Sequence, residues 1–324
     1  MSRFSFPLLR RAAAFALLPL LAVPNGFGWG SDGHRMINRL AMEKLPSDMP
    51  AFMRTPAAIA EVEYLGPEPD RWRSPMEPEL NSAQAPEHFL DLELADVVAD
   101  KNGELPRRRF DYIAALYAAQ PAHPELNLKP EHVGLQPYVA TEVVERLQAA
   151  MREYRGLSAK RQDTAPVEAA ILFYAGWLGH YVGDGSQPLH VTINYNGWAL
   201  PENPHGYTRE HTIHSQFETD FVTANITAKD VSPKMIEVHI VKDYFPDYVT
   251  YLRHTGSLVE RVYQLEKVHG FVGAGSAESR DFVAERLAAG ASVLRDMIYT
   301  AWLNSAKPVP EYHESSQPVK PAGF

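Results

Sequence analysis

The chain has 324 residues, of which 45% are hydrophobic and 22% are charged, as in an ordinary globular protein with a sizeable core. It contains no cysteine, which excludes disulfides, thiolate zinc sites, iron–sulfur clusters and cysteine nucleophiles. The formal charge of −9 argues against a protein that holds nucleic acid by bulk electrostatics alone, although bound metal ions can reverse the sign locally.

Residues 1–28 have the pattern of a secretory signal peptide. Three arginines precede an apolar run over residues 12–23, which is too short to anchor the chain in a bilayer, and the small Gly28 fits a cleavage site. Cleavage there would make Trp29 the first residue and would change the formal charge from −9 to −12, because three arginines and no acid are lost. We therefore expect an exported protein, periplasmic or extracellular, without a transmembrane anchor.

Helical periodicity dominates the rest of the chain. Apolar residues recur at helical spacing over residues 33–44 and 138–154, which predicts amphipathic helices. Residues 165–182 are apolar nearly all round, as expected of a buried central helix. Further predicted helices cover residues 211–223, 247–268 and 279–304. No set of alternating strands separates them, so the predicted fold class is all-α.

Long polar or proline-rich connections separate these helices. They cover residues 64–87, 95–109 and 118–137, and such lengths in a compact domain are typical of binding loops or flexible segments. No internal repeat is present. The predicted organisation is a signal peptide over 1–28, one mostly helical domain with functional loops over 29–305, and a Pro-rich disordered tail over 306–324.

The stretch HYVGDGSQPLH ends the predicted central helix with three groups that can bind metal. Helical geometry puts His180 and Asp184 on one face. Pro188 cannot continue the helix, so the chain can bring His190 back towards the same place. An i,i+4 ion pair beside a surface histidine explains the same residues equally well, so this stretch alone does not decide between the two.

Further candidate ligands lie elsewhere in the chain, and each has an ordinary explanation of its own. His214 and Glu218 repeat the i,i+4 spacing, which is also that of a surface ion pair. His34 stands at the start of the first predicted helix, where a histidine needs no special role. Asp70 and His88 belong to the first long connection, where aspartate more often caps turns.

Taken in chain order, four motifs resemble those of one superfamily. WGSDGH, EHFLDLE, HYVGDGSQPLHV and HSQFE are similar to motifs of the zinc-dependent phospholipases C and single-strand-specific zinc nucleases. The resemblance covers about residues 29 to 303, and the segment ending in QPLH is its most specific part. It implies a mostly helical fold, a trinuclear zinc site and hydrolysis of phosphodiester bonds. No obligate protein partner is evident from the sequence.

The resemblance also implies which residues hold each of the three zinc ions. By position, the three sets are Asp70, His88 and His180, with Asp184 as a bridge; His190, His214 and Glu218; and His34, Asp184 and the free amino group and carbonyl oxygen of Trp29. Signal processing would then complete the last set. His211 competes with His214 and Asp220 with Glu218, and only the match to HSQFE decides for the latter pair.

The ligand types agree with catalytic zinc. Imidazole and carboxylate ligands without thiolate suit zinc sites that keep open positions. Zinc lowers the pKa of bound water to about 7 and can polarise a phosphodiester for attack. Asp70 is expected to serve in addition as the acceptor of the proton that this water loses.

Different sequence features point to two substrate classes, nucleic acid and phospholipid. The short spacing from Trp29 to His34 resembles the nucleases, whereas glutamate as the last ligand resembles the phospholipases. The Gly-Gly-Asn element usual in nucleases is replaced by NYNGW, in which Asn196 and Trp198 are candidate contacts to a base. Other candidate aromatic platforms are Tyr64, Trp72 and Phe89. Single-stranded RNA or DNA is favoured by a narrow margin, and phospholipid is the alternative.

Other classes fit the sequence less well. A helical protein with purely structural zinc would normally close each site with four protein ligands, and about three per metal are available here. A di-iron bundle needs two Glu-x-x-His pairs on helices, and only Glu266–His269 fits. No histidine directly precedes an aspartate, and the H-E-x-x-H pattern of zincin proteases is absent.

Overall fold

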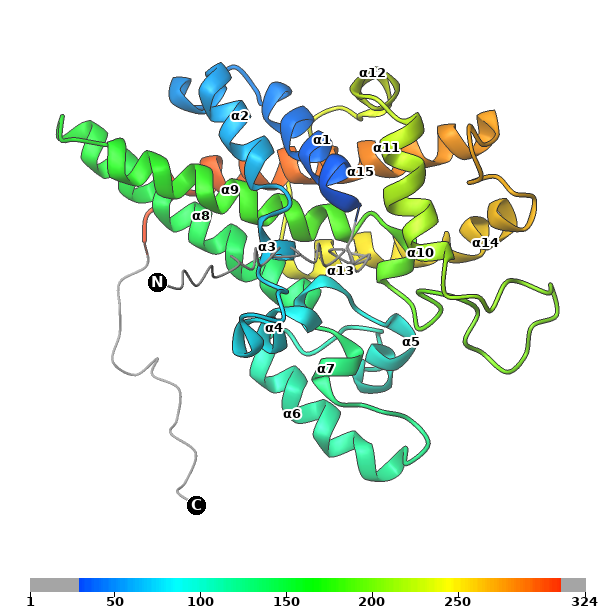
Figure 1. Ribbon diagram of the computed structural model, residues 1–324. Helices are drawn as coiled ribbons and strands as arrows, with labels where there is room; N and C mark the ends of the chain where they lie inside the picture. The colour runs from blue at the N-terminus through cyan, green and yellow to red at the C-terminus, as the bar shows by residue number, and fades with distance from the viewer. Residues whose placement is uncertain (1–28, 310–324) are drawn as a thin grey trace, which may run out of the picture.

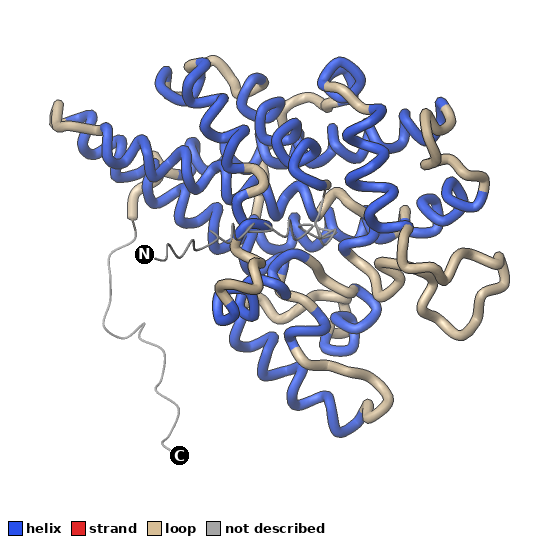
Figure 2. The backbone as a smooth tube through the Cα atoms, viewed as in Figure 1, coloured by secondary structure: helices blue, strands red, loops and turns tan. Residues whose placement is uncertain are grey.

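The computed structural model describes residues 29–309 (Figures 1 and 2). Apart from two isolated β-bridges, the regular secondary structure of these residues is helical. The isolated β-bridges Leu90–Gly134 and Tyr195–Gly197 do not grow into strands. The all-α prediction is confirmed for these residues. No helix among them combines the length and apolar character needed to cross a membrane. The expected signal peptide and residues 310–324 of the expected tail lie outside the described residues.

Five long helices form most of the core. They are α1 (Gly30–Glu43), α8 (Gln136–Ala159), α9 (Ala165–Asp184), α13 (Tyr244–Gly256) and α15 (Ala277–Asn304). The shorter helical elements are η1 (Ala51–Arg54), α2 (Pro56–Leu65), α3 (Glu68–Arg71), α4 (Pro78–Gln84), η2 (Ala85–His88), α5 (Leu92–Ala95), η3 (Asp96–Val98), α6 (Arg109–Ala119), η4 (Gln120–Ala122), α7 (Pro130–Val133), η5 (Pro188–His190), α10 (Ile213–Ser215), η6 (Gln216–Asp220), α11 (Phe221–Asn225), α12 (Ala228–Val231), η7 (Ser232–Lys234) and α14 (Val259–Lys267).

The central helix is α9, which packs against α1, α2, α8 and α15 (Figure 1). Its apolar character on all sides follows from this position. Gly179 lies where α9 meets α1, since a Cβ there would collide with Asn38 and come within 2.8 Å of Leu294 Cδ2. The buried Asn38 amide donates to the carbonyl oxygens of Val62 (2.9 Å) and Gly176 (3.1 Å). This one side chain therefore ties α1 to both α2 and α9.

The helix predicted over residues 247–268 is wrong as a single element. The structure has α13 and α14 instead, separated at Ser257 and Leu258. Glycine at 256 weakens helix propagation at this point. The amides of Ser257 and Leu258 then bond to the carbonyl oxygens of Arg253 and Thr255, which ends the first helix before the second begins.

The helix predicted over residues 211–223 is present but irregular. It begins at Ile213 as α10, widens into the π-helical turn η6 and continues as α11. A π-helical turn inserts an extra residue into the helix and occurs frequently at functional sites. Glu218, one of the expected metal ligands, lies in this turn and is fully buried.

The three long connections are not structureless. They contain the short helices α3, α4 and α7, while α5 and α6 lie between the connections, and this whole set of short helices lies together below the pair formed by α8 and α9 in Figure 1. Prolines at the first turns of α4, η2 and α7 explain why the sequence reads as loop, because proline starts short helices but interrupts the apolar periodicity of long ones. The segments between these helices still carry several residues of the candidate site.

Candidate metal centre

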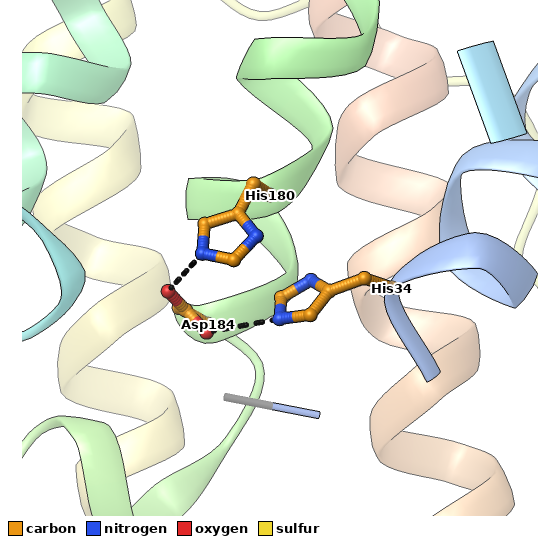
Figure 3. Close-up of side chains that lie close together, drawn as sticks. All are labelled: His34, His180 and Asp184. Carbon is orange, nitrogen blue, oxygen red and sulfur yellow. Dashed lines mark ion pairs between the residues drawn. The ribbon is translucent and has the colours of Figure 1, made fainter. Parts of the chain in front are cut away.

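The centre is built around the last turn of α9. His180 and Asp184 are four residues apart, so both side chains leave the helix on one face, and Asp184 Oδ2 lies 3.3 Å from His180 Nε2 (Figure 3). Both side chains are fully buried. The helix ends at Gly185, and the chain turns through η5 so that His190 Nδ1 comes within 3.6 Å of Asp184 Oδ1. The structure thus brings these three side chains together at the end of α9.

One group of possible ligands joins His180 to the first long connection. His88, at the end of η2, places Nδ1 3.2 Å from Asp184 Oδ2 and 2.9 Å from His180 Nε2. Asp70, in α3, places Oδ1 3.8 Å from both of these imidazole nitrogens. Asp70, His88 and His180 can together hold one metal ion. The resemblance placed Asp70 and His88 in one set with His180, and the structure brings these three side chains together at the end of α9.

A second group joins α1 to the end of α9. His34 Nε2 lies 3.4 Å from Asp184 Oδ1, and its ring stacks on that of His180 with the centroids 4.0 Å apart (Figure 3). Trp29 precedes this helix and is fully buried. Its indole Nε1 donates to Gly183 O at 2.9 Å, which holds Trp29 against the turn that carries Asp184.

A third group joins η5 to the π-helical turn. Glu218 Oε2 lies 2.9 Å from His214 Nε2 and 3.6 Å from His190 Nε2. These three residues can hold a metal ion without any residue of α9. The competing residues His211 and Asp220 are not part of this or any other such group among residues 29–309. The structure thus brings together His214 and Glu218, as the HSQFE segment indicated.

Backbone carbonyl groups orient three of these histidines. Nδ1 lies 2.8 Å from Gly66 O in His180, 2.8 Å from His88 O in His190 and 2.9 Å from Tyr195 O in His214. A histidine that donates through Nδ1 presents the lone pair of Nε2 to its other neighbours, which is the arrangement typical of metal-binding histidine. Sequence reasoning missed these carbonyl partners because a carbonyl group carries no residue-type signature.

The centre contains a concentration of buried polar atoms that have no hydrogen-bond partner. These atoms are His34 Nδ1 and Nε2, Asp70 Oδ1, His88 Nε2, Asp184 Oδ1, His190 Nε2 and Glu218 Oε1. Burying polar groups without partners is costly, and in native proteins such groups are normally satisfied. Four of these atoms, His34 Nε2, Asp70 Oδ1, Asp184 Oδ1 and His190 Nε2, lie between 3.4 and 3.8 Å from a donor atom of another possible ligand, a separation that a cation would bridge. Nitrogen and oxygen donors of this kind fit a divalent metal ion.

Burial and neighbouring charges set the protonation of the first group. Burial lowers the pKa of His88 to about 4, against the opposing effect of Asp184. Burial likewise lowers the pKa of His180, and the neighbouring His34 adds to this effect. Burial raises the pKa of Asp70 to about 7, although His34 opposes the rise. Both histidines are therefore neutral at pH 7, which is the state that binds metal.

The carboxylates deeper in the centre are held ionised by imidazoles. Burial by itself would raise the pKa of Asp184, but His190 and His180 hold it well below its usual range. Burial would lower the pKa of His190, but Asp184 and Glu218 raise it to about 9. Without a cation, His190 thus supplies the positive charge that these carboxylates require.

A pocket of about 490 Å³ opens onto the centre. Three of the possible metal ligands line it: His88, His190 and His214. The rest of the wall is formed by Arg73, Phe89, Asp91, Glu131, His132, Leu189, Tyr195, Asn196, His211 and Ser215. Burial raises the pKa of Asp91 to about 8, and the charge of Glu93 adds to the rise. Because three possible metal ligands line this open pocket, a substrate can reach the metal groups from solvent.

The predicted substrate contacts are only partly found in this pocket. Asn196 and Phe89 line it. Trp198 does not, which corrects the prediction: its ring is 9% exposed and packs on Tyr207 and Tyr263, and its indole donates to Glu202 O. Two further predicted platforms are not among the pocket residues: the Tyr64 ring lies under the guanidinium of Arg71, and Trp72 meets Trp177 edge to face.

Two residues of the wall escaped the sequence analysis. Arg73 places Nη1 3.9 Å from Asp70 Oδ1, and it lies three residues beyond that aspartate. Asp91 likewise lies three residues beyond His88. A charged residue three positions after a candidate ligand was the signal that could have identified both.

Comparison with known proteins gives little further information. No protein-family model matches the chain, and no curated protein matches it. Among solved structures, the chain is similar to a crystal structure of Clostridium perfringens alpha-toxin from the avian strain SWCP, with 14% identity and a TM-score of 0.38. The match covers 87% of this chain, which spans 64% of the length of that one. The all-α fold and the three ligand groups are what the resemblance to the zinc-dependent phospholipases C and zinc nucleases implies.

Proposed function

We propose that this protein is a zinc-dependent hydrolase of phosphodiester bonds. The observation that carries the proposal is the buried centre itself, in which three groups of imidazole and carboxylate donors meet beside an open pocket. Each group offers about three protein ligands, and zinc sites with three protein ligands keep a position open for water or substrate. The proposal includes membership of the superfamily whose motifs the sequence resembles.

The ligands would be divided among three zinc ions. By the resemblance, the sets would be Asp70, His88 and His180 with Asp184; His190, His214 and Glu218; and His34, Asp184 and the backbone of Trp29. The groups of donor atoms that lie close enough to share an ion are Asp70, His88 and His180; His190, His214 and Glu218; and His34, His180 and Asp184. When bound, zinc would lower the pKa of a water ligand to about 7 and stabilise charge on the phosphate oxygens. Residues with nitrogen and oxygen donors alone favour zinc over softer metals.

Residues at the edge of the centre would do the remaining chemistry. Asp70, whose pKa burial raises to about 7, would accept the proton of the attacking water, since an acceptor is most effective with a pKa near the working pH. Arg73 lines the pocket beside Asp70, and a guanidinium there would bind the phosphate oxygens. Phe89 and Tyr195 would contact the organic part of the substrate.

The pocket wall is compatible with both candidate substrate classes, nucleic acid and phospholipid. The wall offers Phe89 and the 55% exposed ring of Tyr195 as surfaces on which a base could stack, together with Asn196 as a polar contact. The burial of Trp198 removes one support for the narrow preference for nucleic acid. A pocket of about 490 Å³ accepts a phospholipid head group as well as a nucleotide, so phospholipid remains the second candidate.

Maturation would be part of the mechanism. Trp29 is the first described residue, and its indole is fixed against the last turn of α9. A free amino group at this position would complete the His34–Asp184 group, and export with removal of residues 1–28 would create it. We expect protein that begins at Trp29 to bind one more zinc ion than protein extended by residues before Trp29, as measured by metal analysis after dialysis. Equal zinc content in the two forms would refute this role.

The function is tested by assaying protein that begins at Trp29 with single-stranded RNA, single-stranded DNA and phosphatidylcholine in parallel. Cleavage that is abolished by EDTA and restored by zinc is expected for one substrate class. His214→Ala should abolish this activity, whereas His211→Ala, which changes a pocket histidine outside the metal groups, should retain a large part of it. Zinc binding without cleavage of any of the three substrates would exclude the proposed function.

A further inference from the structure

The end of α9 is held by side chains from other parts of the fold. Tyr248 Oη donates to Tyr181 O at 2.7 Å, and Tyr251 Oη donates to Val182 O at 3.0 Å. The next carbonyl oxygen, that of Gly183, accepts the indole N–H of Trp29. Three consecutive carbonyl groups, all between the possible ligands His180 and Asp184, thus receive an aromatic donor each.

Helix geometry explains why such donors are needed. The last four carbonyl groups of a helix have no intrahelical donor of the usual kind. Amides beyond α9 reach the carbonyl oxygens of Tyr181 and Gly183, and the Gln136 side-chain amide also donates to Tyr181 O. Among the described residues, the donor that reaches Val182 O from outside the helix is the Tyr251 hydroxyl. The turn that carries Asp184 would otherwise be free to fray.

The two tyrosines are placed for this contact by α13. They are three residues apart on one face, and their ring centroids are 5.6 Å apart. Gly185 permits the approach, since a Cβ there would lie 2.6 Å from Tyr248 Oη. Burial raises the pKa of both tyrosines, so their hydroxyl groups remain donors. In Figure 3 the pale yellow α13 runs beside the end of α9.

We infer that Tyr248 and Tyr251 are positioning residues of the metal centre, which fix His180 and Asp184 in the geometry that binds metal. The inference rests on the proposed zinc site. The tyrosines contact neither metal ligand through their hydroxyl groups and act through the backbone of α9. Outer residues that orient metal ligands typically change metal affinity by about 10–100-fold when they are lost.

The test compares Y248F/Y251F with a matched control, Tyr138→Phe. Tyr138 is also buried and also donates to a backbone carbonyl oxygen, that of Pro106 at 2.7 Å, but this bond does not involve α9. The readouts are zinc affinity, by competition with a chromophoric chelator, and the urea midpoint of the metal-free protein. Both variants should lower the midpoint, because the double variant removes two hydrogen bonds and the control removes one.

Only Y248F/Y251F is expected to weaken zinc binding, by at least about tenfold. The weakening should be confined to the ions that involve α9 and should spare the ion of the group His190, His214 and Glu218. Unchanged affinity in Y248F/Y251F, or an equal loss in Tyr138→Phe, would overturn the inference while the proposed function stands. If wild-type protein bound no zinc, the proposed function would fail first.

Discussion

At the scale of single residues, Asp184 is the most connected group of the centre. Its Oδ1 faces His34 and His190, and its Oδ2 faces His88 and His180, all within 3.6 Å. One carboxylate thus stands between four imidazoles from four separate segments. Because both oxygens are engaged, no other single side chain in the centre can take its place.

Substitution of Asp184 should therefore affect more than one metal ion. We expect Asp184→Asn to lose at least two of three zinc ions, whereas His214→Ala, which alters only the group with His190 and Glu218, should lose one. Metal content per protein, measured by mass spectrometry of the dialysed protein, distinguishes the two. Equal losses would show that Asp184 does not bridge.

Asp91 should make the stability of the metal-free protein depend on pH. Its folded-state pKa of about 8 lies above the unfolded value, so the folded protein binds more protons between about pH 4 and pH 8. The free energy of unfolding then falls as pH rises, by up to about 1.4 kcal/mol per pH unit from this group.

Asp91→Asn should remove this contribution. Urea unfolding of both EDTA-treated proteins at pH 5, 6, 7 and 8 measures it: the stability of the variant relative to wild type should increase steadily with pH. A difference that is constant across this range would contradict the assignment.

At the scale of elements, the close contact between α1 and α9 depends on Gly179, which has no side chain. Gly179→Ala would force a methyl group against Asn38 and Leu294, and overpacking of this kind costs about 1–3 kcal/mol of the free energy of unfolding. Gly156→Ala in α8 is the control, because no atom lies within 4 Å of the added methyl group. That substitution should stabilise the helix by up to about 1 kcal/mol. Urea denaturation of both variants tests the pair, and similar effects would exclude close packing at Gly179.

The sequence allowed the long helices and the ligand set to be predicted, for different physical reasons. Periodic apolar faces located α1, α8, α9 and α15 to within a few residues, because long helices in this fold bury one face or all faces. The convergence of His180, Asp184 and His190 followed from helical spacing and one proline. The remaining ligands were placed by motif resemblance, and the structure brings their side chains together.

What could not be predicted depends on contacts between distant segments. The burial of Trp198 follows from its packing on Tyr207 and Tyr263, and nothing near it in the sequence indicates this. The division of residues 247–268 into two helices depends on a local break at Gly256 that apolar periodicity overlooks. The carbonyl partners of the histidines are likewise products of the tertiary fold.

At the scale of the whole molecule, metal ions would replace the cross-links that the chain lacks. There is no cysteine, and the ligand groups join segments that lie between residues 34 and 218. A ligand that binds only the folded state stabilises it by about 2.7 kcal/mol at a concentration 100 times its dissociation constant. Zinc removal by EDTA should therefore lower the melting temperature by several degrees, as followed by circular dichroism. An unchanged melting temperature would show that bound metal does not stabilise the fold.

The position of α15 has a consequence for biosynthesis. This helix packs against both α1 and α9, and Leu294 and Leu287 approach the contact points at Gly179 and Gly33. It is also the last long helix to leave the ribosome, so a nascent chain holds the segments of the centre before it holds the helix that packs them together. If the centre binds zinc as proposed, capture of the metal would require a completed chain, because α15 must be in place to pack against both α1 and α9.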